Sequence, residues 1–184
     1  HLPNPLFAQK YRIPQIWKGD LETPDGKALL ACSAEGKTIG VCIGVVNDPH
    51  AGEVGIVRLF SGRVRKGDML HMAARMAEEK VQQVAIYMGP DRVMVDNVIA
   101  GNIVGIVGLR DVFVGETVST GEVVPFEQIK HYSEPVITKS IEAKDSKDLT
   151  KLILVLRALG KEDPTLKVEL NPETGEHLIS GMGE

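Results

Sequence analysis

The sequence predicts a mainly β protein in two parts: a β-barrel or β-sandwich, followed by a smaller α+β piece. Short runs rich in β-branched residues recur at about 8–12-residue spacing over residues 38–119, with turn residues between them. After residue 134 the pattern changes to an alternating segment, a helical leucine stripe and two more alternating segments. Glycine is frequent, at 19 of 184 residues, and aromatic residues make up only 4%, which favours short strands and tight turns.

Residues 1–27 are expected to form an irregular linker. Four prolines interrupt this stretch, and the dipeptide Asp25-Gly26 is a turn signal: the prolines are Pro3, Pro5, Pro14 and Pro24. The small apolar run of residues 28–34 then marks the beginning of the first folded domain.

The β domain is placed at residues 28–126. Its expected strands cover residues 38–46, 52–60, 81–88, 92–98, 103–109 and 117–119. Turn signals such as Ser61-Gly62 and Lys66-Gly67-Asp68 separate them, and Glu78-Glu79-Lys80 is expected to be a charged turn. Glycines inside the strands fit the tight bends of a small barrel.

A connector at residues 127–134 leads to the α+β piece at residues 135–184. Residues 135–142 and 165–170 alternate as strands, residues 171–175 form a hairpin turn, and residues 177–180 begin another strand. Between the first two strands, Asp145-Ser146 begins a helix and Gly160 ends it, and its apolar stripe is expected to be core: Leu149, Leu152, Ile153, Leu156 and Leu159. The order β-α-β-β is the first part of a ferredoxin-like unit. This incomplete unit is expected to expose apolar surface and an unpaired sheet edge.

Composition excludes several classes of protein. No apolar run approaches the ~18 residues of a membrane helix, and the opening residues do not form a signal peptide. Cys32 and Cys42 are too few for a disulfide framework and are expected to be buried thiols of a cytosolic protein. The five histidines lie at no metal-ligand spacing. Because the chain does not begin with Met, it is expected to be part of something longer, a processed product or an expression product.

The sequence predicts no catalytic, cofactor-binding or metal-binding residue in this segment. Gly36-Lys37-Thr38 resembles the end of a phosphate-binding loop, but Ala31 stands where that motif needs a glycine and a strand follows. The interpretation is therefore a turn between two strands. No serine, histidine and aspartate set is placed beside a nucleophile elbow.

One basic cluster is the candidate binding site. Arg58, Arg63, Arg65 and Lys66 flank the turn at Ser61-Gly62, and alternation puts Arg63 and Arg65 on one face. Four cations can contact two or three phosphates in a salt-dependent manner, although the net charge of the chain is −4. The alternative is a solvated hairpin. Phe60 is the only aromatic residue nearby in sequence, so stacking of single-stranded bases is not predicted.

Three strings of the β domain together resemble the second domain of translational GTPases. They are GEVGIVRLFSGRVRKGD at residues 52–68, IAGNIVGIVGL at residues 99–109 and VGETV at residues 114–118. Residues 135–184 are similar to the start of the third domain of the ribosomal translocases. The opening strings HLPNP and AQKYRIP, at residues 1–5 and 8–14, are similar to the link leaving the GTPase domain in the archaeal and eukaryotic branch. The chain thus resembles an internal fragment of the archaeal elongation factor 2 family, the counterpart of bacterial elongation factor G.

The resemblance implies a translation-factor-type Greek-key β-barrel followed by a truncated ferredoxin-like domain. It implies a cytoplasmic parent that uses GTP with magnesium to move tRNA and mRNA through the ribosome, with the GTPase motifs outside this segment. The segment itself would serve docking and interdomain relay. Its implied partners are small-subunit ribosomal RNA and the GTPase and C-terminal domains of the same chain, with no membrane. Two alternatives remain: a stand-alone β-barrel binding module, and a sister ribosome-associated translational GTPase.

Overall fold

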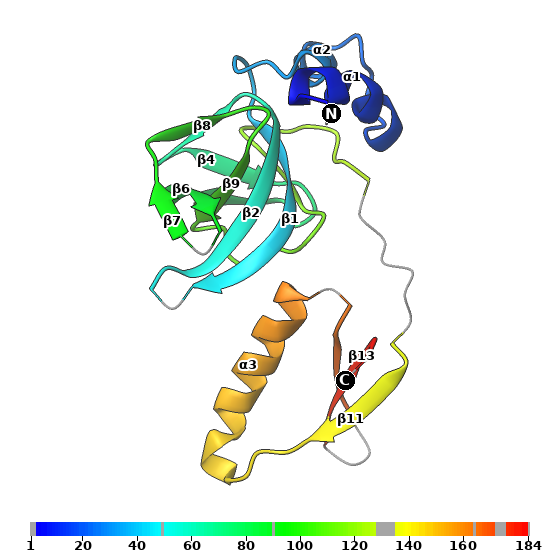
Figure 1. Cartoon of the computed structure of the whole chain (residues 1–184), viewed down its shortest axis with the longest axis vertical. Helices are drawn as coiled ribbons and strands as arrows, with labels where there is room; N and C mark the ends of the chain where they lie inside the picture. The colour runs from blue at the N-terminus through cyan, green and yellow to red at the C-terminus, as the bar shows by residue number, and fades with distance from the viewer. Residues whose placement is uncertain are drawn as a thin grey trace. The chain divides into compact units, whose positions relative to one another are not determined.

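The structure is a computed structural model that describes residues 3–48, 50–89, 91–127, 135–163, 165–171 and 176–183. The chain divides into two compact units, residues 1–129 and residues 130–184 (Figure 1). Each unit is described by itself. Of the expected connector at residues 127–134, only Glu127 lies within the described residues.

The N-terminal segment is helical, so the expectation of an irregular backbone over residues 1–27 was wrong. It contains helix α1 (Pro5–Ile16) and helix α2 (Pro24–Ala31). Each has a proline at its first position, where no backbone N–H is needed, and Pro14 sits only two residues before the end of α1. Side chains cap both helices: the Asn4 Oδ1 accepts from the Phe7 N–H at 2.8 Å, and the Thr23 Oγ1 accepts from the Gly26 N–H at 3.1 Å.

Ten strands follow in the described residues of the first unit. They are β1 (Ile39–Asp48), β2 (Gly52–Ser61), β3 (Arg63–Arg65), β4 (Met69–Met72), β5 (Ala77–Lys80), β6 (Gln83–Met88), β7 (Asp91–Met94), β8 (Asn97–Ile99), β9 (Ile103–Val107) and β10 (Thr117–Ser119). Eight form one antiparallel sheet in the order β5-β4-β10-β1-β2-β9-β6-β7, and β3 pairs with β8. The expected charged turn at residues 78–80 is instead part of β5, because Glu78 and Lys80 pair with His71 and Met69 of β4.

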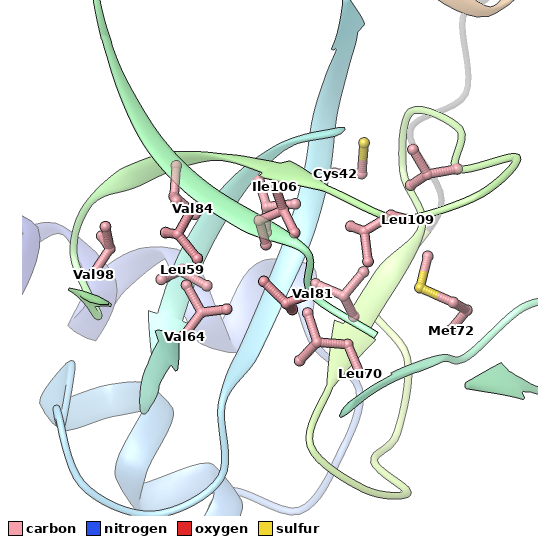
Figure 2. Close-up of a cluster of buried hydrophobic side chains, with 14 of the residues drawn as sticks. Cys42, Leu59, Val64, Leu70, Met72, Val81, Val84, Val98, Ile106 and Leu109 are labelled. Carbon is pink, nitrogen blue, oxygen red and sulfur yellow. The ribbon is translucent and has the colours of Figure 1, made fainter. Parts of the chain in front are cut away.

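Because side chains alternate along each strand, every second one points inward, and these inward side chains form one core cluster. The sheet curves around this core, and Figure 2 shows Leu59, Val84 and Ile106 meeting in it from three different strands. Val, Leu and Ile dominate the cluster, with Cys42 and Met72 filling the remaining space. The barrel core therefore consists mainly of branched aliphatic residues.

The two helices belong to the same folding unit as the barrel. Ile13, Trp17 and Leu29 are buried in a second cluster with Ile39 of β1 and Phe126. The Trp17 indole N–H donates to the Val124 carbonyl at 2.7 Å, and Trp17 forms a β-bridge with Phe126. The chain segment that leads into the barrel is thereby joined to the segment that leaves it.

The second unit has the expected order β-α-β-β. Strand β11 (Ile137–Ile141) is followed by a 3₁₀ turn (Ser146–Asp148), helix α3 (Leu149–Glu162), and strands β12 (Lys167–Leu170) and β13 (His177–Gly181). The antiparallel sheet has the order β11-β13-β12. Gly160 does not end the helix, because α3 continues to Glu162 and Asp163 is its C-cap. Most of the expected hairpin turn, residues 172–175, lies outside the described residues.

The leucine stripe of α3 is less buried than predicted. Leu156 is buried, but Leu149 and Leu159 are exposed, and so are Leu154 and Val155 beside them. Within the described residues of the sheet, β11 and β12 each pair with β13 alone. The exposed apolar surface that the sequence predicted for residues 135–183 is therefore confirmed.

Candidate nucleic-acid interface

The basic hairpin predicted from the sequence is built on a tight turn between β2 and β3. Gly62 has a φ of +72°, and a Cβ atom there would lie 2.5 Å from the Thr38 backbone. The Gly62 N–H donates to the Ser33 carbonyl at 2.7 Å, and the Gly62 carbonyl accepts from the Ala100 N–H at 2.9 Å. The turn therefore has one fixed geometry, pressed against the loop after α2.

Arg63 and Arg65 lie on one face of β3, as predicted. Val64 between them is fully buried in the barrel core, so alternation directs both arginines away from it. Pairing with β8 fixes the strand, with Arg63 opposite Ile99 and Arg65 opposite Asn97. The core thus determines which way these two cations face.

The cations of the hairpin differ in how firmly they are held. The Arg63 Nε–H donates to the Ala34 carbonyl at 3.2 Å, which holds this half-buried side chain against the preceding loop. Arg65 is exposed, and its backbone N–H donates to the Asp68 carboxylate at 2.8 Å. Lys66 is exposed and borders a hollow of about 290 Å³ that Asp96 also lines. Two carboxylates therefore lie near the outer cations and reduce the local positive potential.

Arg58 is not part of this group. Its guanidinium donates to the Gly101 carbonyl at 2.6 Å, and its Cζ lies 5.9 Å from the centre of the Phe60 ring. It lines a groove against α1, together with residues of that helix. The four predicted cations therefore differ in their contacts: Arg58 lines the groove beside α1, and Arg63, Arg65 and Lys66 do not.

The segment Gly36-Lys37-Thr38 lies between α2 and β1, and not between two strands as predicted. The Lys37 ammonium pairs with Asp25 at 2.9 Å and donates to the Glu122 carbonyl at 3.1 Å. The Thr38 hydroxyl donates to the Arg63 carbonyl. These side chains are structural links between α2, β1 and the segment after the barrel.

Both cysteines have raised pKa values. Burial raises the pKa of the Cys42 thiol to about 11, and Glu116 and Glu53 add to the shift. Burial also raises the pKa of Cys32. Among the described residues, no group of three or more His, Cys, Asp or Glu side chains could hold a metal ion. In the same parts of the chain, no helix has the length and apolar character of a membrane span.

Sequence reasoning missed two aromatic residues of α1. Phe7 and Tyr11 are four residues apart, so they share one face of the helix. Their ring centres are 5.2 Å apart in an edge-to-face arrangement, and both line the groove that Arg58 borders. Their spacing signals the pair, but only once the segment is known to be helical.

Comparison with known proteins assigns both units. Residues 37–121 match the family model of elongation factor G domain 2, and residues 132–184 match that of elongation factor G domain III. Over its whole length the chain is 54% identical to elongation factor 2 from Methanocaldococcus jannaschii and from Archaeoglobus fulgidus, and 52% identical to that from Thermococcus gammatolerans. It covers 26%, 25% and 25% of these proteins, so it spans about a quarter of their length.

Proposed function

We propose that the chain is the ribosome-docking segment of a translocase of the elongation factor 2 and elongation factor G family. Matches to domain 2 and domain III of elongation factor G follow each other in its sequence, and it is 54% identical to an elongation factor 2 over its whole length. The parent would be a GTPase that uses GTP and magnesium to move tRNA and mRNA through the ribosome in the cytoplasm. Catalysis would reside in its GTPase domain. The segment would bind small-subunit ribosomal RNA and relay the nucleotide state between that domain and the C-terminal domains.

The observation that carries this proposal is identity of about 54% along all of the chain, through both matched domains and the α1–α2 segment before them. A stand-alone β-barrel module is not favoured, because the similarity continues through residues 130–184. A sister translational GTPase is not favoured either, because the relatives described above are all named elongation factor 2.

For the contact with RNA we propose Arg63, Arg65 and Lys66. The first two are directed outward by the buried Val64, and all three stand on a hairpin whose turn is fixed by Gly62. Because the Gly62 turn and the pairing of β3 fix the backbone of the hairpin, only the exposed side chains need to be ordered when phosphates bind. Arg58 is left out of this contact because it lines the groove beside α1, which the other three cations do not line.

Pelleting of the chain with archaeal ribosomes across a salt series tests the proposal. Binding should weaken steeply with salt, and the double variant Arg63→Gln with Arg65→Gln should lower the slope of log K against log[salt] by about two. The double variant Lys144→Gln with Lys147→Gln is the matched control, because both lysines are exposed in the second unit. Equal slopes for the two double variants, or no binding by the unsubstituted chain, would refute the proposed contact.

A further inference from the structure

A groove separates α1 from strands β1 and β2 of the first unit. Its volume is about 560 Å³, within the ~300–1,000 Å³ range typical of small-ligand sites. Phe7, Tyr11 and Arg12 line it from α1, and Arg58 and Phe60 line it from β2. Residues distant in sequence thus place three aromatic rings and two guanidinium groups around one hollow.

The groove has a fixed base. The Gln9 amide on α1 donates to the Leu29 carbonyl of α2 at 2.5 Å and to the Phe60 carbonyl of β2 at 2.8 Å. Gln9 is buried, and Ile13 one turn further along α1 is fully buried too. On the β2 side, the Phe60 ring stacks on Phe126 with 4.9 Å between ring centres. The two walls are therefore positioned independently of any ligand.

The rings at the rim are largely exposed to solvent. Phe7 is 56% exposed and Tyr11 is 62% exposed. Contiguous exposed aromatic surface of this kind marks an interaction site. A partner that covers it would bury two rings whose orientation is already set by their contact with each other.

Charge distinguishes between the classes of partner. Of the described residues that line the groove, none is acidic, whereas Arg12 and Arg58 are cationic. Lys10 is a further exposed cation on the same helix. An apolar protein segment would satisfy the rings and leave the guanidinium groups without a counter-charge. A nucleotide supplies both a flat base for the rings and a phosphate for the cations.

We propose that this groove binds an unpaired nucleotide of single-stranded RNA. The base stacks on the exposed ring of Tyr11, with the Phe7 ring inclined at 60° beside it. The exposed Arg12 side chain contacts the phosphate. Arg58 is held at Gly101 and contributes positive charge to the inner wall. None of the hairpin cations Arg63, Arg65 and Lys66 lines this groove. The inference rests on the proposed function only for the source of the RNA, which would be the ribosome.

A titration of the chain with a fluorescein-labelled adenosine hexanucleotide, followed by anisotropy, tests this site. The single strand should bind, and a blunt RNA duplex of six base pairs should bind more weakly because its bases are already stacked. Tyr11→Ala should weaken the single-strand affinity by about 5- to 100-fold. Arg12→Gln should reduce the salt slope by about one. Met76→Ala and Lys151→Gln are the matched controls, because both residues are exposed and neither lines the groove. They should leave both values unchanged.

The inference is overturned if the hexanucleotide does not bind at concentrations up to about 1 mM, or if Tyr11→Ala and Met76→Ala bind it equally well. It is also overturned if the duplex binds as tightly as the single strand, because phosphates alone would then account for the affinity. Hexanucleotide binding that depends on Tyr11, combined with absence of ribosome pelleting, supports this groove and refutes the proposed docking function. The two hypotheses therefore fail separately.

Discussion

Cys42 is a titratable group of the barrel core whose pKa is raised. Its side chain is fully buried between the sheet strands, and its thiol donates to the Gly44 carbonyl at 3.2 Å. Burial disfavours the thiolate, so its pKa rises from 9.0 to about 11. The folded state therefore binds this proton more tightly than the unfolded state.

The free energy of unfolding should depend on Cys42 at alkaline pH. A raised pKa contributes stability that is complete below pH 9 and is lost as the pH rises toward 11. Relative to Cys42→Ala, the free energy of unfolding of the unsubstituted chain should fall by roughly 2 kcal/mol across that window. Urea denaturation at successive pH values measures this difference. Cys32→Ala is the control for the second thiol. If the free energies of unfolding of the unsubstituted chain and of Cys42→Ala differ by a constant amount from pH 8 to pH 11, the raised pKa of Cys42 is contradicted.

Arg58 illustrates what sequence position does not reveal about a residue. It lies five residues before Arg63, and alternation along a strand does not tell which neighbour its side chain will meet. The Gly101 carbonyl and the Phe60 ring determine its position, and both are supplied by folding. Arg63 and Arg65 were predictable because the buried Val64 between them fixes the alternation.

At the scale of elements, the β2–β3 turn is the feature on which the hairpin depends. Gly62 and Gly67 lie on either side of β3, and both have a positive φ, of +72° and +93°. Their surroundings differ. A Cβ at Gly62 would lie 2.5 Å from the Thr38 backbone, whereas nothing lies within 4 Å of a Cβ at Gly67.

The two glycines should respond differently to alanine. Gly67→Ala should lower the free energy of unfolding by about 1–2 kcal/mol, the cost of a left-handed conformation for a residue with a side chain. Gly62→Ala adds a clash with backbone that cannot rotate away, so the loss should be at least ~3 kcal/mol. Urea denaturation monitored by the fluorescence of Trp17 measures both. Similar losses for the two variants would mean that the turn is not constrained by Thr38.

The helices α1 and α2 show how local signals can be misread. Four prolines in residues 1–27 suggested an irregular backbone, but two of them occupy first helical positions and are compatible with a helix. The caps Asn4 and Thr23 directly precede these prolines. Burial of Ile13, Trp17 and Leu29 against β1 and Phe126 then supplies the packing energy that so short a pair of helices needs.

At the scale of the whole molecule, the chain consists of two units with separate hydrophobic interiors. The first contains both core clusters, one inside the barrel and one beneath α1 and α2. In the second unit, Leu156 of α3 is buried, while the other large apolar residues of α3 remain partly or largely exposed. The barrel unit therefore has the larger share of the burial that drives folding.

Residues 1–129 produced alone should fold as they do in the whole chain. Their compact unit includes both clusters and the Trp17–Phe126 bridge. We expect the urea midpoint of Trp17 fluorescence to be the same for residues 1–129 as for all 184 residues. The shorter chain ending at residue 121, without the bridge, is the control and should unfold at lower urea. A lower midpoint for residues 1–129 would show that the second unit stabilises the first.

Periodicity and turn residues by themselves determined the mainly β class, the change to β-α-β-β after residue 134, and the outward face of Arg63 and Arg65. These features follow from short-range alternation, which a linear sequence records directly. Only the tertiary structure decided that residues 5–16 are a helix packed on the barrel, that Arg58 leaves the hairpin, and that Phe7 and Tyr11 stand beside Phe60. The reason is physical: these outcomes depend on contacts with residues about 40 to 110 positions away, and no local pattern encodes such contacts.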